Sequence, residues 1–226
     1  MIKWRSHEVM RIEAFSDAVF AFSLTLLIVS LEVPETFEQL TNAMKGFFPF
    51  AVCFLLLFQI WYSQFIFFRR YGLQNLYSII LNALLLFVVL FYMYPLKFLF
   101  NLWIPGGRHS VPAGEIIITQ EQIPELMLIY GSGFISIYII FILLYRYAVK
   151  CKDEIGLDDR ELFVTNTKLY AYYILLFIGI LSVTIAYFSD PSNAGYSGLI
   201  YMLIGPALTI HYSMRGKIFR KKFQPV

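Results

Sequence analysis

The sequence predicts an all-α integral membrane protein that crosses the bilayer six times. Of its 226 residues, 59% are hydrophobic, 19% are aromatic and only 15% are charged, whereas soluble domains carry about a quarter charged residues. Apolar windows of about 20 residues, the length that spans a bilayer, recur along the chain. The windows fall at roughly 9–33, 47–68, 76–100, 125–148, 169–188 and 195–214. Because few residues are left over, we expect residues 1–226 to form a single membrane domain.

The distribution of basic residues predicts the orientation of the chain. With both termini inside, all of the 18 basic residues fall on the inner side except Lys45, Lys97 and Arg108. Lys and Arg accumulate in the cytoplasmic loops of membrane proteins. We therefore expect a multi-pass protein of the cell (inner) membrane with cytoplasmic N- and C-termini. The net charge of +3 fits contact with membrane lipid and gives no reason to expect a nucleic-acid partner.

The motifs of common enzymes are missing from the sequence. It contains no HExxH, GxSxG, CxxC or Gly-rich phosphate loop, and its three histidines are scattered. We therefore expect no enzymatic activity, no catalytic residue and no cofactor.

Two local patterns predict how the helices begin and pack. Asp158 and Glu161 have the spacing of a capping box at the start of the fifth span. Gln64 and Asn82 are amides inside apolar spans, where interhelical hydrogen bonds are their usual role.

The first span begins with charges that a membrane helix rarely carries, in the stretch RIEAFSDAVFAFSLTLL. The uncharged run from Ala18 to Leu31 covers only about 21 Å of a hydrocarbon slab roughly 30 Å thick. Asp17 or Glu32, or both, must then lie at membrane depth, where a charge costs about 2.5–3.5 kcal/mol and usually faces protein or water. We expect this span to be shielded from lipid, and Asp17 to be buried more deeply than Glu13.

A helical wheel separates three stripes on the first span. The first stripe has charges at its ends, the second has serines at every seventh residue, and the third is wholly apolar. Their members are Arg11, Ala18, Phe22, Thr25, Val29 and Glu32; Ser16, Ser23 and Ser30; and Phe20, Leu24, Leu27 and Leu31. The first stripe fits either a helix–helix interface or a pore wall with a hydrophobic constriction. A serine-lined pore is a third alternative, and the wheel leaves all three open.

The pattern Arg11-x3-Phe15-Ser16-Asp17-x7-Thr25-Leu26-Leu27 resembles the signature of the transmembrane protein 175 family. That family comprises the lysosomal potassium channels of animals and their shorter prokaryotic relatives. Trp61, Asn82 and Pro95 also fall where recurrent residues of the family are expected.

The resemblance implies a fold and an activity. Prokaryotic members carry one set of six spans and form homotetramers, so the resemblance implies a tetrameric cation channel without a carbonyl selectivity filter. Passive conduction of potassium would follow a central pore lined by the first span, with no bound metal beyond the permeating K⁺ near Phe22 and Thr25.

Residue roles follow from the resemblance by position. Phe22 takes the place of the family's aliphatic constriction, with Ala18, Thr25 and Val29 along the same wall and Glu32 at the outer mouth. A supporting network is implied for Arg11, Phe15, Ser16 and Asp17, with Trp61 and Asn82 as partners. Two residues depart from the family pattern: Phe22 is aromatic, and Gln64 replaces an expected histidine.

Two rival functions remain open from the sequence. A secondary transporter of a cation or small solute would show paired broken helices or an internal repeat around a midplane site. A scaffold or an unknown membrane enzyme is the other alternative, and the enzyme would need polar residues clustered on one cavity.

Overall fold

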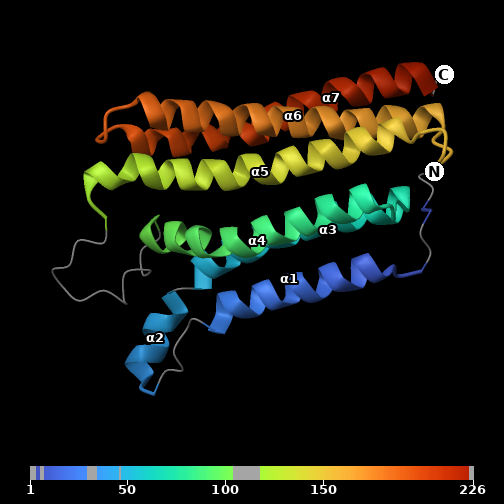
Figure 1. Ribbon diagram of the computed structural model, residues 1–226. Helices are drawn as coiled ribbons and strands as arrows, with labels where there is room; N and C mark the ends of the chain where they lie inside the picture. Colours follow the sequence, from blue (N-terminus) through green and yellow to red (C-terminus); the bar gives the residue numbers. More distant parts are fainter. Residues whose placement is uncertain (1–3, 6–7, 30–34, 46, 104–117, 224–226) are drawn as a thin grey trace.

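Long helices lying side by side make up the described chain (Figure 1). The computed structural model describes residues 4–5, 8–29, 35–45, 47–103 and 118–223. In chain order the elements are α1 (Arg11–Val29), α2 (Phe37–Lys45), α3 (Phe47–Tyr71), α4 (Leu76–Trp103), the 3₁₀-helix η2 (Gln120–Gln122), α5 (Ile123–Lys150), α6 (Asp159–Phe188), the 3₁₀-helix η3 (Ala194–Leu203) and α7 (Ile204–Phe223). The all-α prediction is therefore confirmed for the described residues.

Four helical segments of the described chain are long and apolar enough to cross a membrane. They are Phe50–Tyr71, Leu76–Leu96, Gln120–Lys150 and Asp159–Phe188, and they match the second to fifth expected spans. The first expected span corresponds to α1, and the sixth to η3 followed by α7. Six crossings therefore stay a prediction.

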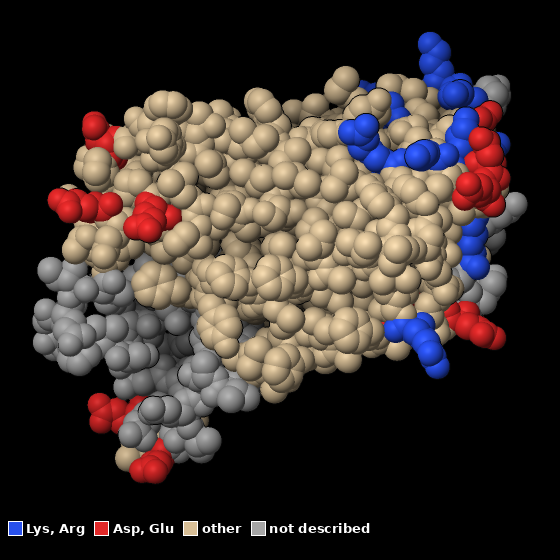
Figure 2. Space-filling view, in the orientation of Figure 1, with Lys and Arg blue, Asp and Glu red and all other residues tan. Residues whose placement is uncertain are grey.

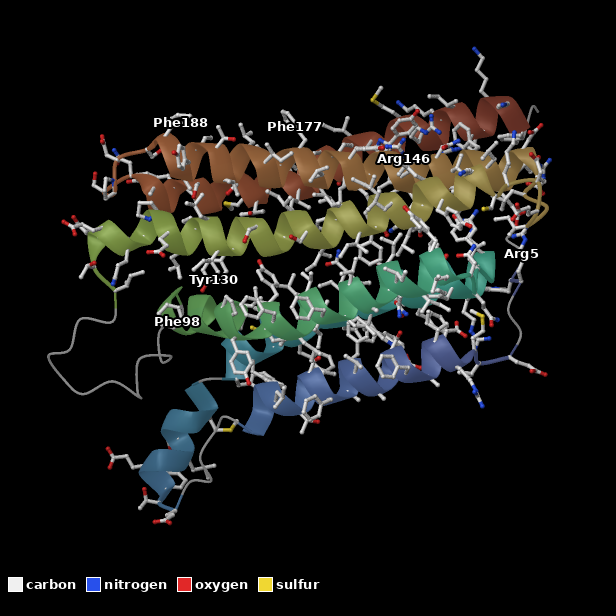
Figure 3. All side chains as sticks on the ribbon, viewed as in Figure 1. Arg5, Phe98, Tyr130, Arg146, Phe177 and Phe188 are labelled. Atoms are coloured by element: carbon white, nitrogen blue, oxygen red, sulfur yellow. The ribbon has the colours of Figure 1, made fainter. Side chains whose placement is uncertain are left out.

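The order of packing leaves α1 at one edge of the subunit. α1 packs against α3 and α4, α4 packs against α5, and α6 packs against α5, η3 and α7. The core lies between the central helices, where Phe67, Leu85 and Leu144 are completely buried. On the far edge, Phe177 and Phe188 point outward from α6 (Figure 3) and are 65% and 80% exposed, as lipid-facing side chains of a membrane helix are. One side of α1 is thus covered by other helices of the described chain, and the other is not (Figure 1).

A capping box starts α6, as the spacing predicts. The backbone N–H of Glu161 donates to Oδ1 of Asp158 at 2.7 Å, and the N–H of Asp158 donates back to Oε2 of Glu161 at 3.4 Å. These bonds satisfy donors that a helix N-terminus leaves free. Consequently α6 begins at Asp159, well before the apolar window at 169–188 from which the span was expected.

Arg5 ties together three segments at the end of the molecule that carries both termini (Figures 1 and 3). Its guanidinium donates to both carboxylate oxygens of Glu161, at 3.2 and 2.6 Å. It also donates to the backbone carbonyls of Gly156 at 2.8 Å and Arg70 at 3.2 Å. Glu161 is only 4% exposed, so this bidentate pair is shielded from water. It joins the chain before α1 to the end of α3 and the start of α6.

We predict that Arg5→Gln destabilises the protein, because Glu161 would keep a buried charge without its bidentate partner. Removing one member of a buried ion pair costs about 3–5 kcal/mol. The measurement is the thermal unfolding midpoint in mild detergent. Arg146→Gln is the matched control, since Arg146 is exposed at the same end (Figure 3). Equal midpoints for the two variants would contradict the prediction.

Candidate functional site

The two sides of α1 have different surroundings. Ser16, Phe20 and Ser23 are 0%, 3% and 0% exposed, and they face α3 and α4. Ala18, Phe22 and Thr25 lie on the uncovered side, where the Phe22 ring is 57% exposed. The serines and Phe20 thus form the packed side of the helix. Ser16 and Ser23 have no exposed surface in the described chain, which argues against the serine-lined pore.

A chain of buried amides and one hydroxyl fixes the packed side. Nε2 of Gln64 on α3 donates to Oδ1 of Asn82 on α4 at 3.1 Å. Nδ2 of Asn82 then donates to Oγ of Ser16 on α1 at 2.8 Å. The Ser16 hydroxyl in turn donates a hydrogen bond to the backbone carbonyl of Ile12, at 2.7 Å. The expectation that Gln64 and Asn82 each make interhelical hydrogen bonds is confirmed, and their bonds link three helices. Hydrogen bonds of this kind hold helices together in lipid, where apolar packing alone is not specific.

Trp61 supplies the partner of Asp17. Its indole Nε1–H donates to Oδ1 of Asp17 at 2.7 Å, a charge-assisted bond between α3 and α1. The indole is held by aromatic neighbours on its own helix, with ring centroids at 5.3 Å from Phe58 and 5.6 Å from Phe65. The carboxylate itself stays exposed at the surface of the single subunit.

Glu13 is the more deeply buried carboxylate of α1, so the expectation that Asp17 would be is wrong for the subunit. Glu13 is 4% exposed; its Oε2 accepts from the backbone N–H of Met10 at 2.9 Å, and its Oε1 lies 3.7 Å from Nε of Arg69. Burial here follows the face of the helix and not the distance from its end. Glu13 shares the side of Ser16, and Asp17 lies at the border of the uncovered side. No sequence pattern pointed to the pairing with Arg69.

The remaining residues of the expected site divide into exposed ones and ones that are not described. Arg11 and Phe15 lie on the uncovered side of α1, with Phe15 62% exposed, so the subunit does not bring them to the bonds of Ser16 and Asp17. The side chain of Val29 and all of Glu32 lie outside the described residues.

The uncovered side combines an apolar surface with one oxygen. Phe22 presents an aromatic ring, and Thr25 follows it three residues later, at nearly one helical turn. The Thr25 hydroxyl donates a hydrogen bond to the carbonyl of Ala21 at 2.9 Å, which leaves the lone pairs of its oxygen available to other groups. Such an oxygen can accept a hydrogen bond or contact a cation.

Comparison with known proteins identifies the family. The family model for the endosomal/lysosomal potassium channel TMEM175 matches residues 11–92. A potassium channel of Marivirga tractuosa is 37% identical over 230 residues, covering 98% of this chain and 93% of that protein. The chain belongs to the TMEM175 family. The matched residues 11–92 contain α1, α3 and most of α4, the helices of this TMEM175 member that carry the bonds of Ser16 and Asp17.

Further relatives and solved structures agree with this assignment. A potassium channel of Chamaesiphon minutus is 25% identical over 210 residues, which cover 83% of this chain and 96% of that protein. The crystal structure of a variant of the potassium channel MtTMEM175 superposes with a TM-score of 0.81 at 35% identity, covering 96% of this chain and 97% of that one. The crystal structure of a Chamaesiphon minutus homologue of the lysosomal potassium-selective channel TMEM175 gives a TM-score of 0.57 at 19% identity, over 91% of this chain and 96% of that one, and shows a shared fold.

We predict that Asn82→Ala lowers stability, because Gln64 and Ser16 would each lose a buried partner. A buried polar group left unsatisfied costs about 1–3 kcal/mol. The readouts are the unfolding midpoint in detergent and potassium flux into liposomes. Gln59→Ala is the matched control, since Gln59 is an exposed amide within α3. A loss in Gln59→Ala as large as that in Asn82→Ala would show that the buried chain has no special role.

Proposed function

We propose that this TMEM175 member is a potassium-permeable channel whose ion path follows the uncovered side of α1. The observation that carries the proposal is the division of α1 into two sides. One side is fixed to α3 and α4 by buried hydrogen bonds. The other presents Ala18, Phe22 and Thr25 to the surroundings of the subunit. In the proposal Val29 continues the same wall, and Glu32 lies at the outer mouth.

The proposed assembly is a homotetramer with four copies of α1 around a central axis. A single α1 at the edge of a subunit cannot enclose a path by itself. Closed cyclic symmetry gives each copy the same environment. Fourfold symmetry comes from the family resemblance and is supported by the 37% identity to the Marivirga tractuosa channel.

Selectivity in this proposal comes from partial dehydration at Phe22. Four rings around the axis make the narrowest and driest point, and hydrophobic constrictions of this kind gate channels by dewetting. Removing water costs less for potassium than for the smaller sodium ion. The Thr25 oxygens, whose protons point to Ala21, replace part of the lost hydration, and the ring faces attract a cation. No carbonyl filter of the TVGYG type is present in the sequence.

The hydrogen bonds that hold α1 against α3 and α4 are also part of the proposal. In the proposal only a few side chains of α1 contact the ion, so the helix must be held against rotation about its own axis. A rotation by one residue would move each side chain by about 100°. The bonds from Asn82 to Ser16 and from Trp61 to Asp17 hold that rotation at two neighbouring positions. Arg11 and Phe15, exposed in the subunit, are proposed to complete the support from a neighbouring copy.

The proposed orientation puts the basic end of the molecule in the cytoplasm. Figure 2 shows Lys and Arg side chains gathered at one end of the face in view, and both termini lie at that end in Figure 1. Positive charge favours the cytoplasmic side. The protein would then be a multi-pass protein of the cell (inner) membrane with six crossings, including α1 and the segment formed by η3 and α7.

The assembly can be tested by mass. We predict that the purified protein in mild detergent has the mass of four chains plus bound detergent or lipid. Native mass spectrometry measures the number of 26.4 kDa chains directly. A stable monomer that still conducts potassium in liposomes would overturn the tetramer.

The constriction can be tested by removing the ring. We predict that Phe22→Ala raises conductance and lowers the K⁺/Na⁺ permeability ratio, because the path widens and ions keep more of their water. Leu24→Ala is the matched control on the packed side and should change stability without changing selectivity. Reversal potentials in planar bilayers with mixed cations give the ratio. Unchanged conductance and selectivity in Phe22→Ala would remove Phe22 from the ion path.

A further inference from the structure

A cavity of about 410 Å³ lies between α3, α5, α6 and α7 at the basic end. We call it the basic cavity. Its charged lining consists of Arg70 from α3, Lys168 from α6 and Arg215 from α7. The ring of Phe163 and the side chain of Ile66 form part of its apolar wall. Its volume falls within the range of about 300–1,000 Å³ that is usual for small-ligand sites.

The three cations of the basic cavity have no carboxylate partner among the described residues. Arg215 donates to Oγ1 of Thr167 at 3.0 Å, and its guanidinium lies 4.0 Å from the centre of the Phe163 ring. Nζ of Lys168 lies 5.4 Å from the centre of the Tyr172 ring. Both salt bridges found in the described part of the chain involve other cations, Arg5 and Arg69.

Arg70 gives the most direct indication that the basic cavity binds an anion. Its side chain is 5% exposed, and it donates one bond, from NH2 to the backbone carbonyl of Glu161 at 3.2 Å. Its Nε is buried and has no hydrogen-bond partner among the described residues. An unsatisfied donor on a buried charge is costly, and an anion in the cavity would remove that cost. Guanidinium groups bind phosphate through two parallel bonds, and Lys is a common second ligand.

The lining of the basic cavity indicates that its ligand also has an apolar part. On the side away from the chain termini it is lined by Tyr62 of α3 and Tyr212 of α7, which are 50% and 42% exposed. Aromatic side chains with a polar tip are typical of the boundary between headgroups and acyl chains. A ligand that fits both parts of the cavity carries a phosphate at one end and an apolar chain at the other.

We propose that the basic cavity binds the phosphate headgroup of an anionic phospholipid from the leaflet at the basic end. Arg70, Lys168 and Arg215 hold the phosphate, and the acyl chains leave past Tyr62 and Tyr212 along the outside of the bundle. The proposal does not depend on ion conduction, because it uses none of the residues on the uncovered side of α1.

The test measures lipid binding to the full-length protein by native mass spectrometry. Delipidated protein in nonionic detergent is titrated with phosphatidylglycerol and, separately, with phosphatidylcholine of the same chains. Wild type should prefer phosphatidylglycerol, and Lys168→Gln and Arg215→Gln should each weaken its binding about tenfold. Lys217→Gln is the matched control, since Lys217 is exposed on α7 two residues from Arg215; it should stay within about twofold of wild type.

Three results would overturn the proposal. The first is equal binding of the two lipids by wild type, which needs no variant. The second is an equal loss in Lys217→Gln and the cavity variants, which would show only a general effect of charge. The third is displacement of phosphatidylglycerol by inorganic phosphate at the same concentration, which would make the cavity a site for soluble phosphate. Unfolding midpoints show that each variant is folded, and either cavity variant alone suffices for the comparison.

Discussion

The hydrogen-bond chain from Gln64 through Asn82 to Ser16 decides how α1 is placed. Its groups are at most 1% exposed, so water cannot replace a lost bond. Rotating α1 by one residue would carry the Ser16 hydroxyl about 100° away from Asn82 and leave buried donors unsatisfied. The positions of Phe22 and Thr25 on the uncovered side follow from this one constraint.

Three carboxylates near the N-terminal ends of long apolar helices are stabilised in three different ways. Glu13 is buried, where it accepts from the start of its own helix and lies near Arg69. Asp17 stays at the surface and accepts from the Trp61 indole. Glu161, at the start of α6, is held by Arg5. In Figure 2 the middle of the face in view shows no Lys, Arg, Asp or Glu side chain among the described residues.

α3 separates the proposed ion path from the proposed lipid site. Trp61 and Gln64 face α1 and α4, whereas Tyr62, Ile66 and Arg70 line the basic cavity. At 100° per residue these two sets point to nearly opposite sides of the helix. The same helix therefore presents hydrogen-bonding groups to the support of α1 and the Arg70 guanidinium to the cavity, and a ligand in the cavity would contact the helix that holds α1.

The sequence by itself determined the all-α class, four helices long and apolar enough to cross a membrane, the Asp158 cap, and the interhelical hydrogen bonding of Gln64 and Asn82, though not that these two amides bond to each other. These features depend on local patterns: length of apolar runs, cap spacing, and the need of a buried amide for a partner. Periodicity divided α1 into stripes but could not say which stripe faced the bundle, because that depends on α3 and α4. Only the tertiary structure decided that Glu13 is buried while Asp17 is not, and that Arg5 pairs with Glu161 across 156 positions. Such contacts depend on how the helices pack, and a local sequence pattern does not show which distant residues will meet.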